Sequence, residues 1–218
     1  MFPQICSGCG RPGSFLCDNC RKSLKYISAP VCVRCGRPLG AGSYCSGCVR
    51  WPMQIDGIRS VFEFEGVIQK LIYDFKYHYV RALAPFLTRF LANYLKNHEL
   101  DMDVLVPVPL HEHRLRERGY NQSALLANEL SRITTIPVIE GVLIRTVDTS
   151  PQARTANINI RRKNVARAFS CNSKELKDKQ ILLIDDVCTT GATLNACAIA
   201  LKKTGAASVW GLTIAREL

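Results

Sequence analysis

The sequence predicts an α/β fold with a mainly parallel sheet, preceded by a small cysteine-rich domain that binds metal. Along residues 53–218, short apolar runs typical of strands alternate with segments of helical hydrophobic spacing. In the first 50 residues apolar side chains are few, and eight of the eleven cysteines gather there instead. The cysteine pairs stop just before Trp51-Pro52, so we expect one domain over residues 1–52 and a second over 53–218.

The cysteines before residue 50 form four Cys-x-x-Cys pairs. A tight turn aims the two sulfurs of a pair at one cation, and two such turns complete a tetrahedral four-thiolate site. Disulfides would need an oxidising compartment, but the sequence shows no secretory signal. A thioredoxin-like redox motif would need a βαβ unit, and this segment has too few apolar residues to form one. We therefore expect two structural zinc ions, with sequential and interleaved pairing of the cysteine pairs both open. The eight expected ligands are Cys6, Cys9, Cys17, Cys20, Cys32, Cys35, Cys45 and Cys48.

The chain is strongly basic, with 29 Lys and Arg against 18 Asp and Glu and a formal net charge of +11. Each zinc tetrathiolate would contribute a net charge of about −2, which still leaves the protein basic. This balance favours polyanionic partners, such as phosphorylated metabolites, nucleic acid or anionic lipid. An ordinary solvated basic surface is the alternative, so charge alone assigns no partner.

Composition and hydropathy exclude several classes of protein. Hydrophobic residues make up 47% and charged residues 22%, which argues against wholesale disorder and against a collagen-like chain. No apolar run approaches the roughly 18 residues that a membrane-spanning helix needs, and no basic region with a following apolar stretch marks a secretory signal. We therefore expect a soluble cytoplasmic protein without membrane insertion.

Hydrophobic spacing predicts the secondary structure of residues 53–218. Strands take the short apolar runs, whereas helices take apolar residues recurring three and four positions apart. Asn121 is a favourable N-cap for one of the helices. We expect strands over 58–64, 103–106, 138–144, 181–184 and 208–214, and helices over 67–75, 83–95, 121–133 and 192–203.

The most informative stretch follows the apolar run at residues 181–184. Two acids, Asp185 and Asp186, come at the expected end of this strand, and a hydroxyl- and glycine-rich turn, Thr189–Thr193, then opens a helix. Backbone N–H groups at a helix N-terminus, joined by threonine hydroxyls, form a cradle for phosphate. Two carboxylates would repel a phosphate but suit sugar hydroxyls or a metal-bound water, so a ribose phosphate satisfies both halves of the pattern. A helix cap and a plain turn would be the simpler interpretation, but they do not account for the whole pattern.

The stretch Leu183–Thr193 resembles the phosphoribosyl-pyrophosphate (PRPP) signature of type I phosphoribosyltransferases. Together with the cysteine pairs, Val106–Pro109, Arg118–Gln122 and Arg161–Phe169, it makes the whole chain resemble the ComF family of competence-associated proteins. The resemblance implies a type I phosphoribosyltransferase-like fold with an N-terminal double zinc ribbon. It also implies PRPP as ligand, Mg²⁺-dependent phosphoribosyl transfer to an unidentified acceptor, and a link to DNA uptake in natural transformation.

The resemblance also implies roles for individual residues. Asp185 and Asp186 would contact the ribose hydroxyls, Thr189–Thr193 would hold the 5-phosphate, and residues 106–110 would face the pyrophosphate with its Mg²⁺. Arg161, in an acid-free basic segment between Asp148 and Glu175, would belong to a mobile loop that closes over PRPP, and it joins the two aspartates as a catalytic candidate. The implied PRPP-binding residues are Val108, Pro109, Arg118, Asp185, Asp186, Thr189, Thr190, Gly191, Ala192 and Thr193.

No acceptor-binding hood is recognisable in the sequence. The aromatic-rich segment over residues 62–79, with Lys76 and Tyr77 near its end, is the expected replacement. The missing hood favours the alternative function, a non-catalytic, PRPP-regulated module that handles single-stranded DNA through its basic ribbons and loop. We expect His111 and His113 to be exposed to solvent rather than to bind metal, and Cys188 and Cys197 to pack in the interior.

Overall fold

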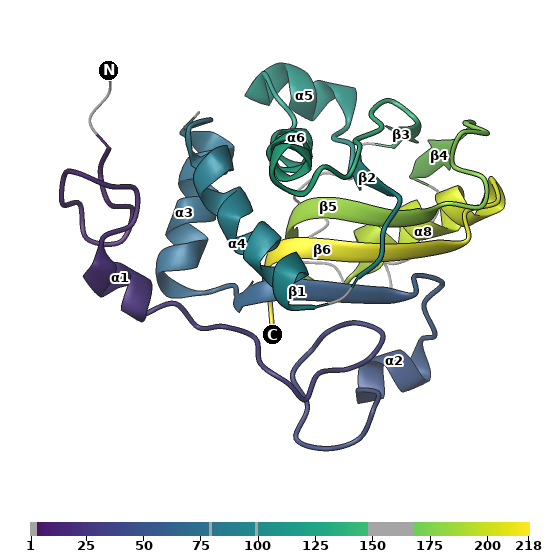
Figure 1. Cartoon of the computed structure of the whole chain (residues 1–218), viewed down its shortest axis with the longest axis horizontal. Helices are drawn as coiled ribbons and strands as arrows, with labels where there is room; N and C mark the ends of the chain where they lie inside the picture. The colour runs from purple at the N-terminus through teal and green to yellow at the C-terminus, as the bar shows by residue number, and fades with distance from the viewer. Residues whose placement is uncertain (1–3, 79, 99, 148–167) are drawn as a thin grey trace.

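The computed structural model describes residues 4–78, 80–98, 100–147 and 168–218 (Figure 1). Its centre is a four-stranded sheet in the order β1-β6-β5-β2. All three neighbouring pairs are parallel, which confirms the predicted α/β fold. The strands are β1 (Gly57–Glu63), β2 (Val104–Pro107), β5 (Gln180–Cys188) and β6 (Ser208–Arg216).

Helices cover both faces of this sheet (Figure 1). Apolar side chains of α3 (Gly66–Tyr77), α4 (Leu83–Asn97) and α6 (Gln122–Thr134) share one core cluster with Leu182 and Ile184 of β5. Those of α8 (Ala192–Lys203) share the other cluster with Ile181 and Leu183. Successive side chains of a strand point to opposite faces, so a strand buried on both sides must be apolar throughout, as β5 is at its start.

Two of the expected strands differ from the observed ones. The expected strand over 138–144 is wrong as a single element: Val138 forms an isolated bridge with Leu105, and β3 (Leu143–Arg145) pairs instead with β4 (Phe169–Cys171) in a separate antiparallel sheet. Gly141, at φ 75°, turns the chain between the two pieces.

The expected strand over 181–184 is also longer than its apolar run. It continues to Cys188 because β6 runs beside it as far as the pair Cys188–Arg216. Asp185 and Asp186 therefore lie within the strand, whereas the sequence placed them just beyond its end.

The N-terminal region packs directly on the sheet. Short helices α1 (Asp18–Lys22) and α2 (Ser46–Arg50) lie within it, and Leu16 and Leu24 join the core beside α3 and α4. Residues 25–27 run along β1, where the Ile27 N–H donates to the Val61 carbonyl and the Glu63 N–H donates to the Lys25 carbonyl, both at 2.9 Å. The two regions that the sequence separates thus share backbone hydrogen bonds and one core.

Among the described residues, no helix combines the length and the apolar character needed to cross a bilayer.

Candidate functional site

The eight N-terminal cysteines form two tetrads. Within each tetrad all sulfur atoms lie within 4.8 Å of one another. The pairing is sequential, so the interleaved alternative does not hold. The first tetrad is Cys6, Cys9, Cys17 and Cys20, and the second is Cys32, Cys35, Cys45 and Cys48.

Backbone N–H groups stabilise the thiolate form of the first cysteine in each tetrad. The Cys17 N–H donates to the Cys6 sulfur and the Cys45 N–H donates to the Cys32 sulfur, both at 3.4 Å. Burial alone would raise the pKa of the Cys6 and Cys32 thiols, but peptide N–H donors stabilise the thiolates and lower each pKa to about 6. Because the thiolate is the form that binds zinc, this donor set fits the metal, and the two tetrads are consistent with two structural zinc sites.

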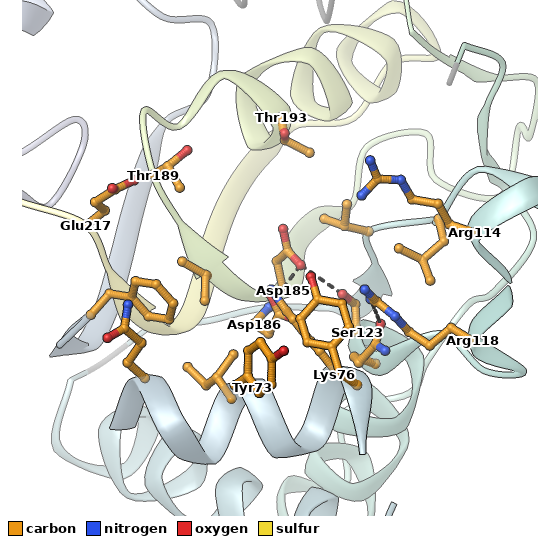
Figure 2. A pocket seen from close by; sticks show the side chains of 18 of the residues that line it. Tyr73, Lys76, Arg114, Arg118, Ser123, Asp185, Asp186, Thr189, Thr193 and Glu217 are labelled. Carbon is orange, nitrogen blue, oxygen red and sulfur yellow. Dashed lines mark hydrogen bonds and ion pairs between the residues drawn. The ribbon is translucent and has the colours of Figure 1, made fainter. Parts of the chain in front are cut away.

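A cavity of about 1150 Å³ opens at the carboxyl edge of the parallel sheet. Figure 2 shows Asp185 at its centre, between α3 on one side and the start of α8 on the other. Nine of the ten expected PRPP-binding residues line it, and Arg161 lies outside the described residues. The nine are Val108, Pro109, Arg118, Asp185, Asp186, Thr189, Thr190, Ala192 and Thr193.

The tenth residue, Gly191, is buried within the turn Thr189–Thr193. It is the N-cap of α8 with φ 79°, a left-handed conformation that favours glycine. A Cβ atom at this position would lie 2.9 Å from Cδ1 of Ile58 in β1, so the close packing also requires glycine. Gly191 therefore shapes the turn Thr189–Thr193, which we call the phosphate loop, without lining the cavity.

Asp185 is held by two hydrogen bonds to the same carboxylate oxygen. The Ser123 hydroxyl of α6 and the Asp186 N–H each donate to Oδ1 of Asp185 at 2.9 Å. Burial and the neighbouring Asp186 raise the pKa of Asp185 to about 7, although Lys76 and the two hydrogen bonds oppose this rise. The carboxylate is thus costly to ionise near neutral pH.

Asp186 is buried and pairs with a lysine. Its Oδ1 lies 2.7 Å from Nζ of Lys76, which comes from the last turn of α3. Figure 2 shows both Lys76 and Tyr73 on this helix, below the aspartates. The sequence associated Lys76 with acceptor binding, whereas in this structure its ammonium group contacts Asp186. The helix still lines the cavity with Tyr73 and Tyr77, which belong to the segment over 62–79.

Three arginines line the cavity. Arg118, at the end of α5 (Glu112–Arg118), donates to Oε1 of Gln122 at 2.7 Å and lies 5.2 Å from the ring centre of Tyr77. Arg114 of the same helix and Arg145 of β3 also line the cavity. Figure 2 shows Arg114 and Arg118 on the side of the cavity away from Thr189.

Sequence reasoning missed five lining residues that carry hydrogen-bonding or charged groups. One of them is Ser7, which lies between Cys6 and Cys9. Ser123 immediately follows the Arg118–Gln122 motif, and Arg114 lies in the basic stretch after Pro109, so both were within reach of a sequence signal. Arg145 and Glu217 had no such signal, because tertiary packing alone brings them to the cavity.

The minor candidates agree with the expectations in part, because His111 is half-buried. His113 is exposed, and His111 accepts the His113 N–H as the N-cap of α5. Cys188 and Cys197 are buried, and burial raises the pKa of the Cys188 thiol to about 11, which disfavours a nucleophilic thiolate.

Two family models match the chain. Residues 1–49 match the double zinc ribbon domain, and residues 120–216 match the phosphoribosyl transferase domain. These matches agree with the cysteine tetrads and with the cavity at the edge of a parallel sheet.

Curated relatives cover almost all of the sequence. The chain is 33% identical to Competence protein F of Haemophilus influenzae, over 90% of this chain and 89% of that protein. It is 32% identical to Competence protein ComFC of Bacillus subtilis, over 95% and 86%, and 27% identical to the DNA utilization protein YhgH of Escherichia coli, over 99% and 98%. Because identity above 30% extends over nine-tenths of the chain and most of two relatives, the chain belongs to the ComF family of competence-associated proteins.

Proposed function

We propose that the cavity binds PRPP and that the protein transfers its phosphoribosyl group to an acceptor. The observation that carries this proposal is the juxtaposition of a carboxylate pair and a helix-opening turn. Asp185 and Asp186 lie in the same cavity as the hydroxyls of Thr189, Thr190 and Thr193. A ribose 5-phosphate is a ligand with hydroxyls for the first group and an anion for the second.

The phosphate loop is suited to the 5-phosphate. Backbone N–H groups at the start of α8 and the helix dipole favour an anion there. The Thr190 hydroxyl accepts the Ala192 N–H at 3.3 Å, so the loop holds its shape before any ligand arrives. This preorganisation reduces the cost of ordering the loop around the phosphate.

The carboxylate pair is suited to the ribose. Asp185 and Asp186 accept hydrogen bonds from hydroxyl groups when ionised, and their oxygens are also the ligands that Mg²⁺ prefers. Lys76 now neutralises Asp186 at 2.7 Å, so ligand binding exchanges this ion pair for contacts to the ribose. When bound, Mg²⁺ supplies neutralisation of the charge that develops on the departing pyrophosphate.

The arginine side of the cavity is suited to the pyrophosphate. Arg114 and Arg118 lie on the side of Asp185 away from Thr189 (Figure 2), and Arg145, Val108 and Pro109 line the same cavity. Guanidinium groups bind phosphoryl oxygens in a forked geometry and stabilise the negative charge that grows on a leaving pyrophosphate. Arg161, which lies outside the described residues, would add a further cation. The α3 face with Tyr73 and Tyr77 would receive the acceptor.

Binding and turnover test this proposal separately. We expect calorimetry to show PRPP binding that strengthens with Mg²⁺ and that is lost in a folded double variant, Asp185→Asn with Asp186→Asn. A pyrophosphate-release screen over nucleobases and other acceptors then tests turnover. Unchanged PRPP affinity in the folded double variant would refute the site, whereas binding without release by any acceptor would refute only the transfer reaction.

The second candidate is a non-catalytic module in which PRPP regulates the handling of single-stranded DNA. The formal charge of +11 and the names of the relatives, competence and DNA utilization proteins, favour it. Binding to DNA should then weaken with salt, with a slope of about −0.7 per neutralised phosphate. Neutralising Arg161, Arg162 and Lys163 should reduce this slope if their loop contacts DNA, and PRPP should then compete. A slope that these substitutions leave unchanged would exclude the loop.

A further inference from the structure

Arg216, at the end of β6, is fully buried and has no acidic partner among the described residues. Its Nη1 donates to the carbonyl oxygen of Cys35 at 2.5 Å and to the Cys188 sulfur at 3.1 Å. Its Nε has no hydrogen-bond partner. A buried cation without a counterion is strongly unfavourable, so the charge of Arg216 needs an anionic group nearby.

The second cysteine tetrad supplies that anion when it holds zinc. Four thiolates and one Zn²⁺ carry a net charge of about −2. Cys35 is both a member of this tetrad and the residue whose carbonyl accepts the hydrogen bond from Arg216. The guanidinium therefore lies where it can compensate the charge of the metal centre.

The same arginine reaches the phosphate loop. Cys188 is the residue before Thr189, and its carbonyl accepts the N–H of Glu217, the neighbour of Arg216, at 3.0 Å. Figure 2 shows Glu217 on the same side of the cavity as Thr189. Arg216 thus contacts the second tetrad and the start of the phosphate loop with one nitrogen atom.

A second set of contacts also connects the second tetrad to the phosphate loop, through Ile58 of β1. In the second ribbon, the carbonyl of Arg34 accepts the N–H of Ile58 at 2.8 Å, and a Cβ added to Gly36 would lie 2.3 Å from the Ile58 carbonyl oxygen. The Ile58 side chain in turn lies against Gly191 of the phosphate loop. Both β1 and β6 therefore connect the second tetrad to the phosphate loop.

We infer that Arg216 is a positioning residue that couples metal loading of the second tetrad to the geometry of the phosphate loop. Metal in this tetrad and PRPP in the cavity then stabilise each other, because coupling between two binding sites is reciprocal. The inference rests on the proposed PRPP binding. Within the described residues, no hydrogen bond joins the first tetrad to the phosphate loop. Ser7 and Gly8, which lie between Cys6 and Cys9, are hydrogen-bonded instead to Asp74 and Lys70 of α3.

Zinc release from the full-length protein tests the coupling. Zinc loss to a zinc-selective chelator is followed with and without saturating PRPP and Mg²⁺, and pulsed cysteine alkylation read by mass spectrometry assigns each loss to a tetrad. We expect PRPP to slow zinc loss from the second tetrad and not from the first. Equal protection of both tetrads, or protection of neither by PRPP that binds, would overturn the inference.

Variants at Arg216 separate positioning from general stability. We expect Arg216→Met to accelerate zinc loss from the second tetrad alone, by roughly tenfold or more, and to weaken PRPP binding. Arg216→Lys, which keeps the charge, should show smaller changes in zinc loss and in PRPP affinity than Arg216→Met. Arg132→Met, on the exposed face of α6, should change neither quantity. A folded Arg216→Met protein with normal zinc loss and PRPP affinity would contradict the inference. If this variant does not fold, the wild-type measurement decides alone.

A measurement that needs no PRPP tests the coupling independently of the proposed function. Hydrogen exchange of the amides of residues 188–193 is compared between zinc-loaded protein and protein that has lost metal from the second tetrad. Faster exchange in the stripped protein supports the coupling even if wild-type protein fails to bind PRPP, a result that would refute the proposed function only. Unchanged exchange in these residues would overturn the coupling.

Discussion

Replacing Asp185 with Asn should stabilise the empty protein while abolishing PRPP binding. The Asn side chain keeps an Oδ1 that accepts the Ser123 hydroxyl and the Asp186 N–H, so the local hydrogen bonds survive. What it removes is a carboxylate whose pKa is raised by burial and by Asp186. The substitution therefore isolates the cost of holding charge at the centre of the cavity.

The pKa sets the size and the pH range of the effect. The rise from an ordinary 3.8 to about 7 gives an upper limit of about 4 kcal/mol. Asp185 is only half-buried and the charge of Lys76 opposes the rise, so we expect about 2 kcal/mol, or roughly 4–8 °C in Tm. Between pH 3.8 and about 7 the folded protein retains a proton that the unfolded chain releases, so the carboxylate destabilises the fold increasingly as pH rises. Above pH 7 the difference between wild type and variant should be constant.

Thermal or urea unfolding without ligand, at a series of pH values from 4 to 8, measures this difference. We expect Asp185→Asn to be close to wild type in stability at pH 4 and clearly more stable at pH 8. The matched control is Glu140→Gln, which removes an exposed carboxylate that accepts from Asn128 and should show no such trend. A variant that is less stable than wild type at pH 8, or a difference independent of pH, would refute the assigned pKa and its cause.

Three further predictions concern the metal sites, the loop and the acceptor. Metal analysis should give two zinc ions per chain for wild type and one for Cys6→Ser or Cys32→Ser. Cys32→Ser should lose more thermal stability than Cys6→Ser, because the second tetrad is hydrogen-bonded to Arg216 of β6. Equal losses of stability in the two variants would contradict this reasoning. Gly191→Ala should lower stability by about 1–3 kcal/mol and weaken PRPP binding measured by calorimetry, since its φ is 79° and its Cβ would press on Ile58; normal stability would show that the loop tolerates a side chain. Tyr73→Ala should leave PRPP affinity intact and reduce acceptor-dependent pyrophosphate release; the reverse pattern would place Tyr73 at PRPP instead.

Local patterns made the fold and half of the site predictable. The continuous apolar run before Asp185 indicated a buried parallel strand, and the turn ending at Thr193 indicated a helix N-terminus, because both features depend on neighbouring residues. The pairing of Lys76 with Asp186, the burial of Arg216 and the position of Arg145 could not be predicted, since each depends on residues far apart in sequence. The same reason explains why β5 extends beyond its apolar run: its length is set by β6 and not by its own composition.

The pairing of residues 25–27 with β1 has a consequence for the behaviour of the protein under zinc shortage. β1 is the outermost strand of the sheet, and the N-terminal segment occupies backbone groups on its free side, with Tyr26 packed over Phe62 at 4.6 Å between ring centres. If the ribbons unfold without metal, this segment is released and an apolar strand edge becomes available to other chains. The metal-depleted protein should therefore self-associate and aggregate through β1, so that zinc protects its solubility as well as its shape.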